Sequence, residues 1–85
     1  MDKSELIDKI DLILAETLEI DSSIIKPETN LVDDLGADAL DLMEIIMRTE
    51  IQFSIDLNEY DRCLENNLLT VNDLYVAVEA VLNPK

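Results

Sequence analysis

The chain is organised around LVDDLGADALDLME, residues 31–44, in which a glycine-containing loop leads into an acidic helix. Asp38 is the expected N-cap of that helix, because its side chain can accept a hydrogen bond from a first-turn amide, and Asp41 adds a second negative charge to the same turn. Residue 39 is then the first helical position, at the positive end of the helix dipole, where an attached phosphate would be well placed. Position 39 is alanine, however, which can attach nothing.

The composition favours a single all-α domain. A chain of 85 residues is long enough for one domain, although a domain of this size buries only about 60% of the surface that its unfolded chain exposes. Hydrophobic residues make up 48% of the chain, with one glycine and two prolines. This balance favours ordered helices over disorder or a turn-rich β fold. We therefore expect residues 1–85 to form one all-α domain.

The charge balance is strongly acidic, with 20 acidic and 6 basic residues and a formal net charge of −14. Such a chain repels nucleic acid and anionic lipid and favours partners with basic docking surfaces. No apolar run approaches the ~18 residues of a membrane span, and the mixed charge at the start of the chain does not resemble a secretory signal. Cys63 is the only cysteine, so no internal disulfide forms. We expect a soluble cytoplasmic monomer that binds neither nucleic acid nor membranes.

Apolar residues at helical spacing predict a first helix over residues 3–19, with Asp2 and Glu5 as a capping-box variant at its start. Periodicity then fails over residues 21–37, where serine, proline and asparagine favour turns. A loop of that length is unusual in a compact domain unless it is functional or fixed in place. We therefore expect its apolar residues to pack into the core: Ile24, Ile25, Leu31, Val32 and Leu35.

The same spacing predicts a second helix over residues 39–52 and a shorter candidate helix over residues 58–64. Thr70 and Asp73 form a capping-box variant at the start of the last helix, and Asn83-Pro84 ends it. The predicted architecture is a four-helix bundle with one short helix and a long loop between the first two main helices.

The second helix has an inward face and an outward face. Its inward face is formed by Leu42, Ile45, Ile46, Thr49 and Phe53. Its outward carboxylates are Asp41, Glu44 and Glu50. Three apolar residues lie on the flank between the faces: Leu40, Met43 and Met47. Two roles are open for these three, because apolar residues at helical spacing are usually core, whereas methionines beside acidic residues can also form an adaptable docking patch.

The residue inventory argues against catalysis. The chain has no histidine, so it lacks the usual general base and the commonest zinc ligand. Asp61 and Glu65 flank Cys63 and disfavour its thiolate, which makes a small core residue the better reading than a nucleophile. The aspartates within residues 33–38 lack the ligand spacing of an EF-hand, so we expect no metal site. Gly36 is isolated, and its expected role is to permit a tight turn.

The stretch DLGADALD at residues 34–41, followed by Met43 and Glu44, resembles the Asp-Leu-Gly-x-Asp-Ser-Leu signature of the acyl carrier proteins, with alanine in place of serine. The resemblance extends over essentially the whole chain. It includes a helix before a long loop, Phe53 at the end of the second helix and Thr70-Val71 at the start of the last. It implies an acyl-carrier-like fold.

In that family a 4′-phosphopantetheine arm is attached to the motif serine and carries acyl groups as thioesters between enzymes. The resemblance implies that Ala39 stands at the attachment position, between Asp38 and Leu40, and that this chain cannot hold the arm. It also implies that the second helix binds basic surfaces of acyl-processing enzymes and of a phosphopantetheinyl transferase. The implied docking residues are Asp38, Leu40, Asp41, Met43, Glu44, Met47 and Glu50.

Ala39 has two readings. The better supported is an attachment site altered to remove the hydroxyl, because the surrounding motif is intact; the other is an acidic interaction or scaffold module that binds basic partners without any arm. Further departures from the family pattern are Arg48, Ile51 and the extra residues between Leu57 and Thr70. These departures favour a specialised member with its own partners. Fatty acid, polyketide and peptide synthesis and a dedicated modification route are all open as its pathway.

Overall fold

A computed structural model describes residues 2–57 and 70–83. Its elements are α1 (Lys3–Leu18), the short 3-10 helix η1 (Ser22–Ile24), α2 (Ala39–Phe53) and α4 (Val71–Leu82). Within those two ranges the only β pairing is an isolated bridge between Asn30 and Thr70. The predicted all-α fold class is confirmed. The candidate helix over residues 58–64, with Cys63, lies outside the described residues.

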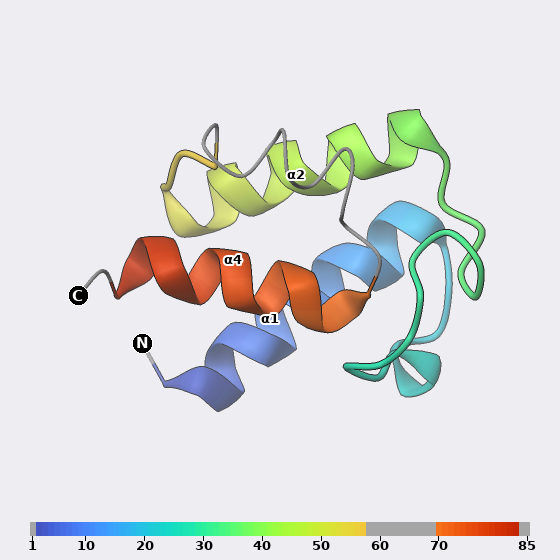
Figure 1. The fold of residues 1–85 in the computed structure, drawn as a ribbon, viewed down its shortest axis with the longest axis horizontal. Helices are drawn as coiled ribbons and strands as arrows, with labels where there is room; N and C mark the ends of the chain where they lie inside the picture. Colours follow the sequence, from blue (N-terminus) through green and yellow to red (C-terminus); the bar gives the residue numbers. More distant parts are fainter. Residues whose placement is uncertain (1, 58–69, 84–85) are drawn as a thin grey trace.

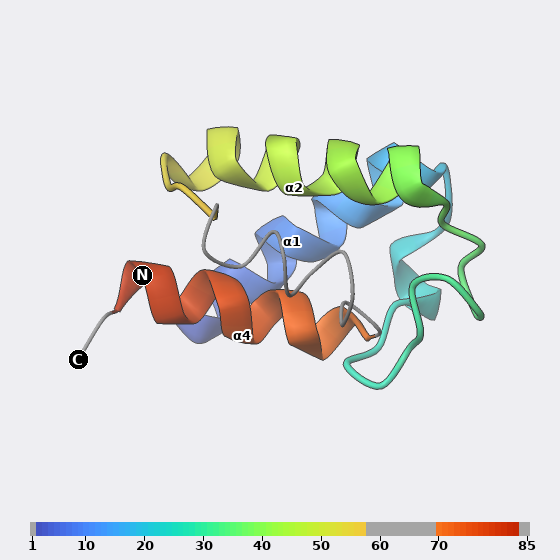
Figure 2. The same ribbon diagram turned by 45° about the horizontal axis from the view of Figure 1, so that its top comes forward.

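Of the three long helices, α1 packs against both of the others, α2 and α4 (Figures 1 and 2). α2 and α4 begin at the same end of the molecule, where the long loop also lies, and α1 runs in the opposite general direction. The beginning of α1 and the end of α4 therefore lie at the other end. This arrangement places the start of α2 beside the loop that precedes it.

Each long helix buries one face in a shared core. In α1, Leu6, Ile10 and Leu14 recur every four residues, so they lie on one side of the helix, and each is at most 1% exposed. The buried residues of α2 are Ile45, Ile46, Thr49 and Phe53, and those of α4 are Val71, Leu74, Tyr75, Ala77 and Val78. Thr49 is the one polar member of this described core, and its hydroxyl donates a 2.7 Å hydrogen bond to the Ile45 carbonyl. Its burial therefore leaves no unpaired hydroxyl.

The long loop contributes fewer apolar side chains to the core than the sequence predicts. Ile25 and Leu31 are buried and Leu35 is half-buried, as expected. Ile24 and Val32 are 52% and 44% exposed, so the prediction for these two is wrong. Each is a chain neighbour of a buried residue in a turning segment, and adjacent side chains in a turn point in different directions. Only one member of each pair can reach the core.

Backbone hydrogen bonds hold this loop against the start of α4. The Val71 amide donates to the Thr29 carbonyl at 3.0 Å, and the Asn72 amide donates to the Pro27 carbonyl at 2.9 Å. The first amides of a helix have no acceptor within the helix. The loop supplies those acceptors for α4, so the two segments fix each other.

The capping predictions succeed for α4 and fail for α1. The Asp73 amide donates to Thr70 Oγ1 at 3.3 Å and the Thr70 amide donates to Asp73 Oδ2 at 2.9 Å, which completes the predicted capping box. Asp2 occupies the N-cap of α1, but its side chain accepts no cap hydrogen bond. Only its carbonyl is used, by the Leu6 amide at 3.0 Å. The start of α1 is exposed, where water can satisfy the remaining amides.

A half-buried side-chain hydrogen bond joins α1 to α4, in addition to the exposed ion pair of Lys3 with Glu79. The Tyr75 hydroxyl donates a hydrogen bond to Asp11 Oδ1. Burial raises the pKa of the Asp11 carboxyl above its ordinary value, the hydrogen bond from Tyr75 lowers it, and the nearby charge of Asp8 raises it. Burial and the neighbouring Asp11 also raise the pKa of Tyr75. Tyr75 therefore remains a neutral donor at physiological pH.

The helices found in residues 2–57 and 70–83 are too short or too polar to cross a bilayer.

Candidate functional site

The turn before α2 is organised by Asn30 and closed by Gly36. Asn30 Oδ1 accepts hydrogen bonds from the amides of Val32 and Asp33, at 2.9 and 2.7 Å, and the Asn30 amide donates to Asp34 Oδ2 at 2.8 Å. Gly36 has a φ of +73°, in the left-handed region that glycine adopts without strain. The predicted role of Gly36 as a turn residue is confirmed, and so is the prediction that the asparagine of this loop favours a turn.

Two buried residues anchor this turn in the core. Leu31 is fully buried and Ala37 is 3% exposed, and the Ala37 amide donates to the Leu31 carbonyl at 3.0 Å. Ala37 directly precedes the N-cap of α2. The start of α2 is therefore held at a fixed distance from the core by its own preceding turn.

The N-terminus of α2 has a complete capping box. The Asp41 amide donates to Asp38 Oδ1 at 2.9 Å and the Asp38 amide donates to Asp41 Oδ2 at 3.2 Å. The Asp38 carbonyl also accepts the Leu42 amide at 3.0 Å. Two negative side chains at this end complement the helix dipole. The predicted N-cap and the predicted first helical position are both confirmed.

Ala39 is the first residue of α2, and its side chain is exposed to solvent. It lies between the capping residue and Leu40, in the turn whose amides have no acceptor within the helix. The position is accessible to solvent, and it directly follows the residue whose hydrogen bonds cap the helix. The methyl side chain has no hydroxyl, so it does not fit the attachment of a phosphodiester.

The structure excludes the core role, one of the two left open for the apolar flank of α2. Leu40, Met43 and Met47 are 75%, 60% and 54% exposed, so they are not core residues. Ile51, one turn beyond Met47, is 73% exposed and continues the same row. The sequence carried this signal, because Ile51 follows Met47 by four residues. Its membership of the row was nevertheless missed.

The outward carboxylates of α2 are less exposed than the sequence predicts, and two of them accept hydrogen bonds from the backbone. Asp41, Glu44 and Glu50 are only half-exposed. Asp41 takes part in the capping box, and Glu50 Oε2 accepts a 2.9 Å hydrogen bond from the Leu57 amide. Glu50 therefore holds the segment that follows α2 as well as facing solvent.

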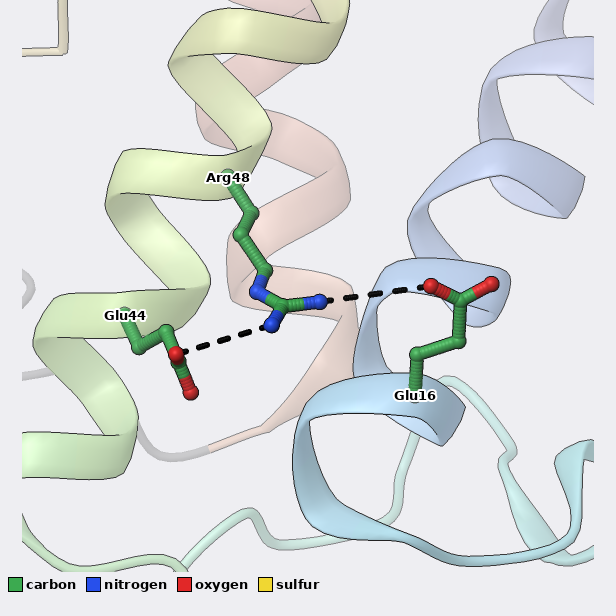
Figure 3. Close-up of polar contacts among 3 residues, drawn as sticks. All are labelled: Glu16, Glu44 and Arg48. Carbon is green, nitrogen blue, oxygen red and sulfur yellow. Dashed lines mark ion pairs between the residues drawn. The ribbon is translucent and has the colours of Figure 1, made fainter.

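Arg48 pairs with carboxylates on two helices (Figure 3). Its Nη2 lies 3.6 Å from Glu44 Oε1 on the same helix, and its Nη1 lies 3.9 Å from Glu16 Oε2 on α1. The three side chains are 43–60% exposed, so these pairs add little stability. The pairs do change the local charge, because the Arg48 guanidinium lies beside the Glu44 carboxylate.

The described residues hold no group of three or more His, Cys, Asp or Glu side chains arranged to bind a metal ion. The acidic residues at the start of α2 are engaged in the turn and in the capping box instead.

Comparison with known proteins identifies the family. A family model described as "Phosphopantetheine attachment site" matches residues 8–66, which includes the whole of α2 and the turn before it. The acyl carrier protein of Syntrophobacter fumaroxidans is 40% identical over 75 residues, which cover 88% of this chain and 89% of that protein. The chain belongs to the acyl carrier protein family. The acyl carrier protein of Thermotoga maritima is 36% identical over 80 residues, 94% of this chain and 95% of its own length.

Membership of the acyl carrier protein family agrees with the resemblance seen in the sequence. Acyl carrier proteins are carriers and not enzymes, and 4′-phosphopantetheine is the prosthetic group of the matched family. The helical fold is consistent with that of an acyl carrier protein. Acyl carrier proteins work by interacting with acyl-processing enzymes.

Proposed function

We propose that this chain is an acyl carrier protein in a form that cannot be loaded, because Ala39 stands where the family attaches its arm. In a loadable form the arm would carry acyl groups as thioesters from one enzyme to the next. The observation that carries the proposal is the geometry around position 39: an exposed first helical residue, preceded by a complete Asp38–Asp41 capping box and a glycine turn. Only the hydroxyl is missing from this arrangement.

The outer face of α2 is the proposed docking surface for acyl-processing enzymes and for a phosphopantetheinyl transferase. Its proposed members are Asp38, Leu40, Asp41, Met43, Glu44, Met47 and Glu50. The exposure of the three apolar members supports this role. A chain with a net charge of −14 attracts basic surfaces from a distance, which speeds encounter. Exposed ion pairs are individually weak, so the complexes should also exchange rapidly. A shuttle needs both properties.

The experiment is a competition assay with a broad-specificity phosphopantetheinyl transferase. The Ala39→Ser variant is the substrate, and the unmodified chain is added as a competitor. Because the two chains share the docking surface, we expect the Ala39 chain to inhibit loading competitively, with an inhibition constant close to the KM of the variant. If the Ala39 chain does not inhibit loading at concentrations far above that KM, the proposed docking surface is wrong.

Ala39 itself favours a second candidate function, that of an acidic interaction module that works without an arm. Such a module would be complete in its present form, with a capped α2 and an exposed apolar row. Pull-down with the Ala39 chain and with a loaded Ala39→Ser chain separates the two functions. A carrier gains partners when the arm is present, whereas an arm-free module retains the same partners in both forms.

We propose further that residues 1–85 act as a single monomeric domain in the cytoplasm. The one cysteine, the acidic charge and the composition of the chain support this proposal. Analytical ultracentrifugation tests the monomer: the sedimenting mass should equal that of one chain at both low and high protein concentration.

A further inference from the structure

All seven backbone amides from residue 32 to residue 38 have a hydrogen-bond acceptor in the turn before α2 or in its capping box. The amides of Val32 and Asp33 donate to Asn30 Oδ1, at 2.9 and 2.7 Å. The amides of Asp34 and Leu35 donate to the Asn30 carbonyl, at 3.0 and 3.1 Å. The acceptors of the last three amides are the Val32 carbonyl for Gly36, the Leu31 carbonyl for Ala37 and Asp41 Oδ2 for Asp38. Four of the seven amides therefore donate to one residue, Asn30.

Asn30 also donates to the turn, because its own amide bonds to Asp34 Oδ2 at 2.8 Å. It makes five hydrogen bonds to residues 32–34 and 35: two through Oδ1, two through its carbonyl and one through its amide. The short side chain of asparagine suits this role, since its oxygen reaches amides two or three residues further along the chain. An alanine at position 30 would leave the amides of Val32 and Asp33 without this acceptor.

The backbone of Asn30 lies against the start of α4. Asn30 forms an isolated β bridge with Thr70, which is the N-cap of α4. Beside the bridge, the Val71 amide donates to the Thr29 carbonyl at 3.0 Å. Val71 is fully buried in the core. The residue that folds the turn is therefore also the residue that meets α4.

The other end of the turn leads directly into α2. Ala37 is 3% exposed and its amide donates to the Leu31 carbonyl, so the residue before the N-cap is held in the core. Asp38 follows as the N-cap and Ala39 as the first, exposed residue of the helix. The place of residue 39 relative to α4 thus depends on how the turn from Asn30 to Ala37 is folded.

We propose that Asn30 is a positioning residue for the attachment position. By folding the turn against the start of α4, Asn30 holds the capping box at Asp38, and through it residue 39, in one orientation. This inference rests on the proposed function, because it concerns the loading of the same site.

Orientation matters for the reaction at residue 39. In loading, the hydroxyl oxygen that Ala39→Ser introduces forms a bond to a phosphorus of coenzyme A. The bond from that phosphorus to the nucleotide part breaks, and a base of the transferase takes up the hydroxyl proton. A displacement of about 1 Å from the reactive geometry can cost about 100-fold in rate. A loosened turn should therefore slow the chemical step.

The first test measures whether the effect of Asn30 reaches the capping box. Backbone amide order parameters from NMR relaxation are recorded for the unmodified chain and for Asn30→Ala. We expect the values at residues 32–35, 38 and 41 to fall from about 0.85 to about 0.6 or below, while residues 45–53 of α2 keep theirs. A fall that is confined to residues 32–35, or no fall at all, would refute the positioning role.

The second test measures loading in the Ala39→Ser background, with coenzyme A and a broad-specificity phosphopantetheinyl transferase. Because Asn30 is not a proposed docking residue, we expect Asn30→Ala to lower kcat about tenfold and to leave the KM for the carrier within about twofold. Asn30→Asp keeps an oxygen acceptor for the amides of Val32 and Asp33, so it should retain about half of kcat or more. An unchanged kcat in Asn30→Ala, or an equal loss in Asn30→Asp, overturns the proposal.

Ile10→Val is the control for a general loss of stability. Ile10 is fully buried in α1, so its shortening lowers the Tm without removing a hydrogen bond of the turn. At a temperature where circular dichroism shows every variant to be folded, Ile10→Val should keep its kcat. An equal loss of kcat in this control would show that stability, and not positioning, is the cause. If Ala39→Ser is not loaded at all, the proposed function fails, whereas the NMR test on the unmodified chain still decides the role of Asn30.

Discussion

At the residue scale, the contact between Tyr75 and Asp11 predicts a pH dependence of stability. Burial raises the pKa of Asp11 above its ordinary value of 3.8, and the hydrogen bond from Tyr75 opposes that rise. The native state therefore binds a proton more readily than the unfolded state, so this group lowers the free energy of unfolding as the pH rises through the range above 3.8.

Removal of the Tyr75 hydroxyl should strengthen this effect. In Tyr75→Phe the opposing hydrogen bond is lost while burial remains, so we expect the pKa of Asp11 to rise further. A carboxyl NMR titration of both chains measures the change, and urea unfolding at several pH values should show a steeper loss of stability in the variant. Asp11→Asn serves as the control, since it removes the titrating group. A pKa of Asp11 that stays constant or falls in Tyr75→Phe contradicts this account.

Single residues also show how far the sequence could predict the site. Asp38, Asp41 and Gly36 were predictable, because capping and tight turns depend on local chemistry that short sequence patterns carry. Asn30 was predicted as a turn residue, but the three hydrogen-bond partners of its side chain and amide were not, since they depend on how the following residues fold back on it. The bridging position of Arg48 was equally hidden, because Glu16 is distant in the chain and only the packing of α1 on α2 brings the two together.

At the element scale, the capping boxes should contribute measurably to helix stability. We expect Asp38→Ala and Thr70→Ala each to reduce the free energy of unfolding by about 0.5–2 kcal/mol, because each removes a side-chain acceptor from a first-turn amide. Asp2→Ala is the matched control: Asp2 is also an N-cap but makes no side-chain cap hydrogen bond. Its effect should stay within about 0.5 kcal/mol. Urea unfolding provides all three values, and an Asp2→Ala loss as large as the other two would be inconsistent with the capping geometry.

The elements themselves were largely predictable, and their limits less so. The periodicity of apolar residues located α1, α2 and α4 within a residue or two, since one face of each packs into the same core. The failed capping box at Asp2 and the exposed Ile24 and Val32 have a common cause. Sequence patterns show which contacts a residue could make. Which of those contacts form depends on whether water competes for them and on the direction in which the backbone points each side chain.

At the scale of the whole molecule, the net charge of −14 should make stability depend on salt. Like charges held close together repel one another in the compact state, and added salt screens that repulsion. We therefore expect the Tm to rise between 10 and 300 mM sodium chloride, and a gain of about 1 kcal/mol would appear as roughly 4–8 °C. An uncharged osmolyte at equal osmolality is the control for solvent effects. A Tm that falls with salt would mean that the exposed ion pairs of Arg48 and the lysines outweigh the repulsion.

The most direct measurement of the central claim is the intact mass of the Ala39→Ser variant after incubation with coenzyme A, Mg²⁺ and a broad-specificity phosphopantetheinyl transferase. The account predicts a gain of one phosphopantetheine by Ala39→Ser, and none by the unmodified chain. Asp38→Ser is the matched control, because serine keeps an N-cap acceptor and introduces a hydroxyl one residue too early, and this variant should also stay unmodified. A folded Ala39→Ser chain that remains unmodified, while another carrier in the same tube is loaded, would contradict the claim that this site lacks only its hydroxyl.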